Sequence, residues 1–442
     1  MRSNSASNRL WTRRRVLGGT AALAGAAAFG GLTRTSGRAQ TALRVLAPRI
    51  TFAEATESQI ASFKELTGMD VTFDIFAEPE AQQKNTVELA AGTGAYDVVW
   101  TGSNQIPQYA QAGWLESLEP FIAEEDPAEL NLEDFIQPLL EAGRRDGELY
   151  GLPVFIGTQL FYYRTDVVSA APDTFEALLA TAKEVHGNPV PGFAIRGGRG
   201  RDLALWPFPL FMLGFGGKWF ADFPNDMHPT LDSPEVIQAA EYWVDLLGNY
   251  GIPNIASANF DEVLNAVAQG QTAMAIEGAP LAARLYDPEQ SQVSDKLGMA
   301  LVPQGPAGRF PPFAPHHWAI PTSARDKDAS WQFIKWALSA ETQLQGALAT
   351  NHIAVSRRSV WENPEFKTKY DYSGDGRFAQ LFLDSALAAT TTYRPPVPEW
   401  AQLGDRLSIG LNEALTGQKS ASEAMQEVQK DMTDLFQRAG YY

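Results

Sequence analysis

Strand and helix patterns alternate near the start of the chain, and this alternation constrains the fold more than any other feature. Residues 43–46, 71–75 and 97–100 have the apolar or alternating character of short strands. The two segments between them have helical spacing and end at Gly68 and Gly92. Because each strand is followed by a helix, the pattern predicts a parallel sheet with right-handed crossovers.

The first of these helices has a start signal and an apolar face. Thr51 and Glu54 have the spacing of a capping box, in which both side chains bind free backbone N–H groups at a helix start. Ile60, Phe63 and Leu66 follow at helical spacing, and we expect all three on the buried face.

The later chain predicts a second α/β domain followed by long helices. Strands are expected at residues 272–276 and 297–302, and a long helix is expected at residues 328–348. A capping box at Ser420 and Glu423 predicts the start of the last helix.

The first 39 residues have the pattern of an export signal and are not expected to belong to the fold. Arginines at residues 13–15 precede an uncharged apolar stretch at residues 16–32, and Ala39 ends a small-residue cleavage site. Paired arginines in this context are typical of the twin-arginine signal. The alternative, a transmembrane anchor, requires a longer and more apolar run.

Composition excludes several classes of protein. The chain has no Cys, so disulfides, thiolate catalysis, Cys-ligated metals and a Cys-linked lipid anchor are excluded. The leader holds seven of the 35 basic residues and no acidic residue, which leaves 28 basic and 52 acidic residues and a mature charge of −24. Such a charge disfavours nucleic acid and anionic membranes and favours a soluble monomer. No later apolar run is long enough for membrane insertion.

Five segments in chain order resemble the periplasmic sugar-binding proteins of the maltose-binding-like class. The similarity extends to the branch that includes sugar-alcohol binders, and it covers nearly all of the mature chain. The segments are residues 96–100 with 109–118, 146–153 with 161–166, 270–278, 317–321, and 414–417 with 420–440.

The resemblance implies a two-lobed α/β fold of the class II periplasmic-binding type, with discontinuous lobes joined by a hinge. Residues 40–157 with 314–353 are expected to form one lobe, and residues 158–313 with 354–442 the other. The protein is then the periplasmic solute-binding subunit of an ABC importer, not an enzyme. A small carbohydrate or polyol binds in the cleft, and the partners are the membrane permease and its ATPase. The expected hinge crossings lie near residues 156–159, 312–316 and 351–355.

A sugar offers hydroxyl groups and apolar C–H faces, so its site needs polar side chains around an aromatic ring. In the first lobe the candidates follow the parallel strands, where ligands bind in such sheets. They are Arg49, Glu78, Asn104 and Gln105. Asn104 and Gln105 match positions at which the family uses polar contacts, although a charged pair is usual there. A helix-capping role for Asn104 and a solvated Glu78 are the alternatives.

In the second lobe the candidates are Gln159, Trp206, Glu277, Gly278 and Trp400. Gln159 lies at the first crossing, and the two tryptophans match stretches that supply aromatic contacts in the family. Core packing is the alternative for Trp206. Glu277 ends a strand beside Gly278, where a missing side chain lets a ligand approach the backbone. A helix-terminus carboxylate without ligand is the alternative for Glu277.

The return crossing contains two adjacent histidines. On an extended strand His316 and His317 point to opposite faces, so they do not bind one metal together. We expect one toward the cleft and one toward the core, with Trp318 on the face of His316 as a sugar platform. No third ligand has the spacing of a zinc motif, and no metal or cofactor is expected.

Two other functions remain open from the residues alone. An exported glycoside hydrolase needs two carboxylates in one cleft, and Glu54, Glu78 and Glu277 are the candidates, although no catalytic motif marks them. The same fold with a polyamine or another solute as ligand is the second alternative.

Overall fold

The computed structural model describes residues 42–200 and 203–442. The predicted export signal and its cleavage site at Ala39 lie outside the described residues. Within the described ranges, every helix is too short or too polar to cross a membrane.

The first sheet has five strands in the order β2-β1-β3-β13-β6. Strand β1 pairs in parallel with β2 and β3, and the connecting helices end at left-handed Gly68 and Gly92, as predicted. Strand β13 arrives from much later in the chain and pairs antiparallel with β3 and β6. The strands are β1 (Leu43–Pro48), β2 (Val71–Phe76), β3 (Val98–Gly102), β6 (Leu152–Gly157) and β13 (Ala314–Ala319).

The second sheet has the order β12-β7-β11-β8. Strand β7 pairs antiparallel with β11 and β12, whereas β8 is parallel to β11. The strands are β7 (Gln159–Arg164), β8 (Phe193–Ala194), β11 (Met274–Gly278) and β12 (Leu297–Ala300). Two small hairpins consist of β4 (Arg144–Arg145) with β5 (Glu148–Leu149) and β9 (Phe220–Asp222) with β10 (Asp226–Pro229).

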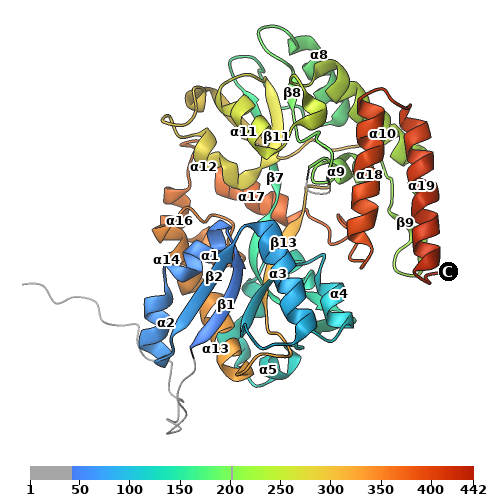
Figure 1. Ribbon diagram of the computed structural model, residues 1–442. Helices are drawn as coiled ribbons and strands as arrows, with labels where there is room; N and C mark the ends of the chain where they lie inside the picture. Colours follow the sequence, from blue (N-terminus) through green and yellow to red (C-terminus); the bar gives the residue numbers. More distant parts are fainter. Residues whose placement is uncertain (1–41, 201–202) are drawn as a thin grey trace, which may run out of the picture. The chain divides into compact units, whose positions relative to one another are not determined.

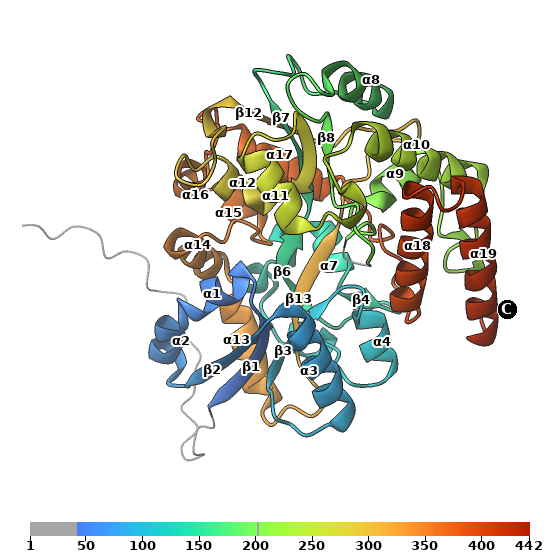
Figure 2. The same cartoon turned by 45° about the horizontal axis from the view of Figure 1, so that its top comes forward.

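Helices surround both sheets. Figure 1 shows α1 to α5 and α13 around the first sheet, and α8 to α12 with α17 to α19 around the second. Helices α18 and α19 lie side by side and both pack against α10 (Figure 2). The helices are α1 (Thr51–Glu57), α2 (Ile60–Thr67), α3 (Glu78–Ala91), α4 (Ile106–Gln111), α5 (Glu119–Ala123), α6 (Pro127–Leu130), α7 (Gln137–Glu141), α8 (Phe175–Val185), α9 (Phe208–Gly214), α10 (Pro234–Tyr250), α11 (Phe260–Ala268), α12 (Ala282–Leu285), α13 (Lys327–Ala337), α14 (Ala340–Ala349), α15 (Arg358–Glu362), α16 (Pro364–Lys369), α17 (Arg377–Leu387), α18 (Trp400–Leu415) and α19 (Ala421–Arg438).

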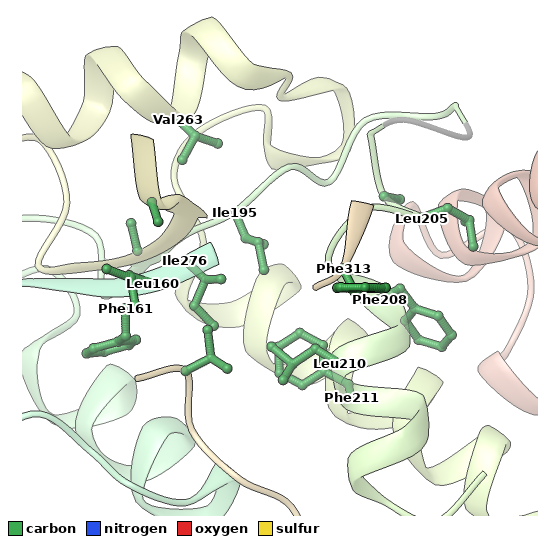
Figure 3. Packing of buried hydrophobic residues seen from close by; sticks show 14 of the residues in the cluster. Leu160, Phe161, Ile195, Leu205, Phe208, Leu210, Phe211, Val263, Ile276 and Phe313 are labelled. Atoms are coloured by element: carbon green, nitrogen blue, oxygen red, sulfur yellow. The ribbon is translucent and has the colours of Figure 1, made fainter. Parts of the chain in front are cut away.

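Two hydrophobic cores stabilise these layers. The first contains Val45 and Phe333, and the second contains Phe208 and Phe313, which Figure 3 shows close together. Burying a side chain of this size contributes roughly 1.5–3 kcal/mol, so a chain without disulfides is held by these cores. Phe155 of β6 packs against both cores and therefore marks the place where they meet. The exact lobe boundaries stay a prediction.

The predicted capping box at Thr51 is wrong. Helix α1 begins at Thr51 itself, its N-cap residue is Ile50, and no side chain caps it. The Thr51 hydroxyl instead lies 3.1 Å from Nδ1 of His352, a residue from the far part of the chain. Leu66, expected on the buried face of α2, is 48% exposed, whereas Phe63 is buried.

The single helix predicted at residues 328–348 is two helices, α13 and α14. Ser339 separates them because its hydroxyl accepts a hydrogen bond from the backbone N–H of Thr342 over 3.1 Å and caps the second helix. The capping box at Ser420 and Glu423 is confirmed.

Candidate functional site

The candidate site centres on His316 of β13, next to Trp100 of β3. The two strands pair so that His316 lies opposite Gly102, and the Trp100 indole N–H donates to His316 Nδ1 over 2.8 Å. His316 is 8% exposed, and the rings of Phe52 and Phe155 lie 5.9 and 5.0 Å from its ring. One polar ring is therefore enclosed by aromatic side chains where the two cores meet.

The imidazole of His316 is neutral. Burial, with smaller contributions from His317 and Arg394, lowers the pKa of His316 from 6.5 to about 3. Arg394 lies between α17 and α18, and its positive charge makes a small contribution to the lowered pKa of His316.

Arg394 lies near two tryptophans that the sequence predicted as ligand contacts. Its guanidinium carbon is 5.0 Å from the ring of Trp206 and 5.7 Å from the ring of Trp400. The Tyr393 hydroxyl donates to the Trp206 carbonyl over 2.6 Å, and Trp219 packs edge-on against Trp400 at 5.4 Å. The structure thus brings Trp206 and Trp400 together around one cation. Trp206 is 8% exposed and Trp400, which belongs to the second core, is 2% exposed, so their contact with ligand stays a prediction.

Strands β7 and β11 place two further candidates, Gln159 and Gly278, opposite each other. Gln159 is fully buried, and neither its Oε1 nor its Nε2 has a partner among the described residues. Beside Gly278 the nearest atoms to an added Cβ would be 3.9 Å away, so a side chain there would meet no clash. Buried amides without partners are rare and call for a functional or structural explanation.

Replacing Gln159 by Met is expected to raise the free energy of unfolding of the ligand-free protein by about 1–2 kcal/mol, because an unpaired polar group disappears while volume is kept. Urea denaturation measures this change. Gln343→Met is the matched control and should destabilise, because the buried Gln343 amide donates to Leu338 and Ser356. A loss of stability in Gln159→Met would show that bound water satisfies the amide in the folded protein.

Glu277 has a partner that sequence reasoning missed. Its carboxylate accepts two hydrogen bonds from Arg196, over 2.8 and 2.7 Å, and a third from the Gly278 N–H over 2.7 Å. The side chains of Glu277 and Arg196 are 1% and 16% exposed, and the guanidinium lies over Phe260. The ligand role of Glu277 stays a prediction, but a large part of its hydrogen-bonding capacity serves this ion pair.

The ligand residues predicted at the first sheet differ from one another in burial and in hydrogen-bond partners. The buried Gln105 amide accepts from a backbone N–H over 3.0 Å and donates to Tyr109 over 3.2 Å, so its bonds are made within the loop. Asn104 is half-buried, and it does not cap α4, whose N-cap residue is Gln105. Arg49 follows β1 and Glu78 begins α3, and both are exposed.

The sugar platform predicted at Trp318 is wrong. Its side chain is 0% exposed and meets Phe52 edge-on at 5.3 Å and Phe73 edge-on at 6.2 Å, because this part of β13 packs into the first core. His317 Nε2 donates to the Leu139 carbonyl over 2.9 Å, so the two histidines bind different partners, yet both are buried.

The described residues show two cavities away from this site. One, of about 890 Å³, lies over α8 and α10, and the other, of about 520 Å³, lies beside α12 and α16. Neither is lined by a predicted ligand residue. In the described part of the chain, no cluster of three His, Asp or Glu side chains is arranged to hold a metal.

The sequence of this chain is similar to those of known binding proteins. Residues 49–344 match the family model of the bacterial extracellular solute-binding proteins. The mannitol-binding protein of Pseudomonas aeruginosa is 26% identical over 392 residues, which cover 83% of this chain and 86% of the relative. A probable amino-acid ABC transporter periplasmic-binding protein of Sinorhizobium fredii is 24% identical over 415 residues, which cover 90% of each chain.

A solved structure shows the same fold. The ABC transporter solute-binding protein of Agrobacterium radiobacter K84, in complex with ribitol, superposes with a TM-score of 0.77 at 23% identity, over 89% of this chain and 98% of the other. The predicted two-lobed α/β fold is therefore confirmed. Since the family model spans well over half of the sequence, the chain belongs to the bacterial extracellular solute-binding proteins.

Proposed function

We propose that the protein is the solute-binding subunit of an ABC importer and captures a small uncharged carbohydrate or sugar alcohol. The observation that carries this proposal is the neutral His316 enclosed by aromatic rings, with the Arg394 guanidinium beside Trp206 and Trp400. Hydroxyl oxygens accept hydrogen bonds from such donors, and C–H faces pack on aromatic rings. A site of this composition suits a ligand with many hydroxyl groups.

The proposal retains most of the ligand residues that the sequence predicted, adds Arg394 and omits Trp318. Gln159 and Gly278 supply an unpaired amide and an unobstructed backbone position. Gln105 acts by holding its own loop, and Glu277 acts by holding Arg196. The other retained residues are Arg49, Glu78, Asn104, His316, Trp206 and Trp400.

The names of two similar proteins support the ligand class. One relative is a mannitol-binding protein and one structural neighbour contains ribitol, and both compounds are uncharged linear polyols. The relative named for amino acids supports a second candidate class. An amino acid needs a carboxylate for its ammonium group, and the Glu277 carboxylate already binds Arg196.

We infer that residues 40–157 with 314–353 and residues 158–313 with 354–442 form lobes that close on the ligand. Closure is driven by the preference of the ligand for the closed state, and the closed form binds the membrane permease with its ATPase. The protein acts as a periplasmic monomer after removal of residues 1–39, and it releases its ligand unchanged.

A thermal-shift screen of residues 40–442 tests the function. Mannitol, ribitol, maltose, amino acids and spermidine are compared, and one polyol or sugar family is expected to raise the melting temperature. A ligand at about 100 times its Kd adds about 2.7 kcal/mol to the free energy of unfolding. Calorimetry with recovery of intact ligand then distinguishes binding from hydrolysis. A rise with amino acids or spermidine alone would contradict the proposed ligand class.

A further inference from the structure

The hydrogen bond from Trp100 decides which nitrogen of His316 carries the proton. An indole N–H donates and has no lone pair to accept, so His316 Nδ1, 2.8 Å away, is the acceptor. A neutral imidazole then carries its single proton on Nε2. Trp100 is 2% exposed, so water does not compete for this bond.

The proton on Nε2 is available to a ligand. In residues 42–200 and 203–442, no hydrogen-bond partner of His316 is found besides Trp100. In these ranges Nδ1 of His317 is a polar atom that is fully covered and has no partner. Nε2 of His316 is not such an atom, so it is not fully covered. The 8% of His316 that remains exposed therefore includes its N–H donor.

We infer that Trp100 is a positioning residue that presents the Nε2–H of His316 to the ligand, and that the ligand atom received there is an accepting oxygen, which in a sugar or polyol is a hydroxyl or ether oxygen. This inference rests on the proposed function and specifies the chemistry of the same site. An ammonium group has no lone pair with which to accept the hydrogen, so polyamines and amino groups are rejected at this point.

The donor is retained over a wide range of pH. The pKa of His316 is lowered to about 3, chiefly by burial, and the charged or titratable groups that act on it are His317 and Arg394. The elements packed against its ring contribute Trp100, Phe52 and Phe155, which do not titrate. Ligand affinity is therefore expected to be constant wherever the protein stays folded above pH 5.

Nuclear magnetic resonance of protein with ¹⁵N-labelled histidine tests the inference, and the chain has only five His. In the ligand-free protein we expect His316 with a protonated Nε2 and an unprotonated Nδ1. The best ligand of the thermal screen should shift the Nε2–H signal. Trp100→Phe should give a mixture of tautomers and an affinity about tenfold lower, the effect of one lost hydrogen bond.

Trp318→Phe is the matched control. Trp318 is paired with Trp100 in the register of β3 and β13, and its own Nε1 has no partner in the described residues. This variant loses the same ring volume without losing a bond to His316, so affinity should stay within about threefold and the tautomer should not change.

Three results would overturn the inference while leaving the proposed function intact. They are a protonated Nδ1 in the ligand-free protein, a Nε2–H signal that does not respond to bound ligand, and equal loss of affinity in the two Trp variants. A wild-type protein that binds no sugar or polyol would instead overturn the proposed function. In that case the tautomer of the ligand-free protein still decides whether Trp100 positions His316.

Discussion

Lowering the pH from 7.5 to 5.5 is expected to reduce the free energy of unfolding of the ligand-free protein by about 4 kcal/mol. Three buried histidines, His316, His317 and His352, account for this loss. Burial lowers their pKa values from 6.5 to about 3, about 4 and about 3. Urea denaturation at several pH values measures the effect.

The direction follows from proton binding in the two states. In the unfolded chain each histidine returns to its ordinary pKa of 6.5 and binds a proton as the pH falls below that value. In the folded protein the three rings stay neutral until about pH 4. Their stabilisation is therefore complete above pH 6.5 and is lost as the pH falls, by about 1.4 kcal/mol for each ring at pH 5.5.

One variant assigns the effect to the buried rings. His352→Gln should reduce the pH dependence by about a third, whatever it does to stability at pH 7.5. Carboxylates with lowered pKa values, such as Asp166 and Glu423, change the free energy of unfolding only below their ordinary pKa values of 3.8 and 4.5. These values lie outside the range from pH 7.5 to 5.5. Constant stability between pH 7.5 and 5.5 would show that the three rings reach water in the folded protein.

Replacing Glu277 by Gln is expected to lower the free energy of unfolding by about 3 kcal/mol. The change removes one charge from a buried ion pair and leaves the Arg196 guanidinium in a site where only 16% of its side chain is exposed. Breaking such a pair typically costs about 3–5 kcal/mol, and the other contacts of Arg196 place the expectation at the lower end. Denaturation of the ligand-free variant at pH 7.5 measures it.

An exposed ion pair provides the control for Glu277. The side chains of Lys430 and Asp434 are 75% and 52% exposed, so Asp434→Asn should cost less than about 1 kcal/mol. Replacing Arg196 and Glu277 together by Met should recover much of the loss, because no buried charge then remains. If Glu277→Gln instead keeps full stability and weakens ligand binding more than tenfold, Glu277 is a ligand contact rather than the partner of Arg196.

The candidate site was predictable only where residue type and strand position were sufficient. His316 and Trp206 were predicted because rare aromatic and imidazole side chains stand in segments that resemble ligand-binding loops. Arg394 and Arg196 were missed because a single basic residue has no local sign of its partner. Arg196 binds Glu277, 81 residues further along the chain, and no spacing rule connects the two.

The sequence by itself determined strands β1, β2 and β3 of the first sheet, the helix ends at Gly68 and Gly92, and the two-lobed fold class through its resemblance to a family. These properties depend on neighbouring residues, whose periodicity and backbone freedom are visible in a short window. Only the tertiary structure decided that Trp318 is core and that Trp100 binds His316, 216 residues away. The face of a strand that is buried, and the partner that a buried polar atom finds, depend on how distant segments pack, and that packing energy is not encoded in any single segment.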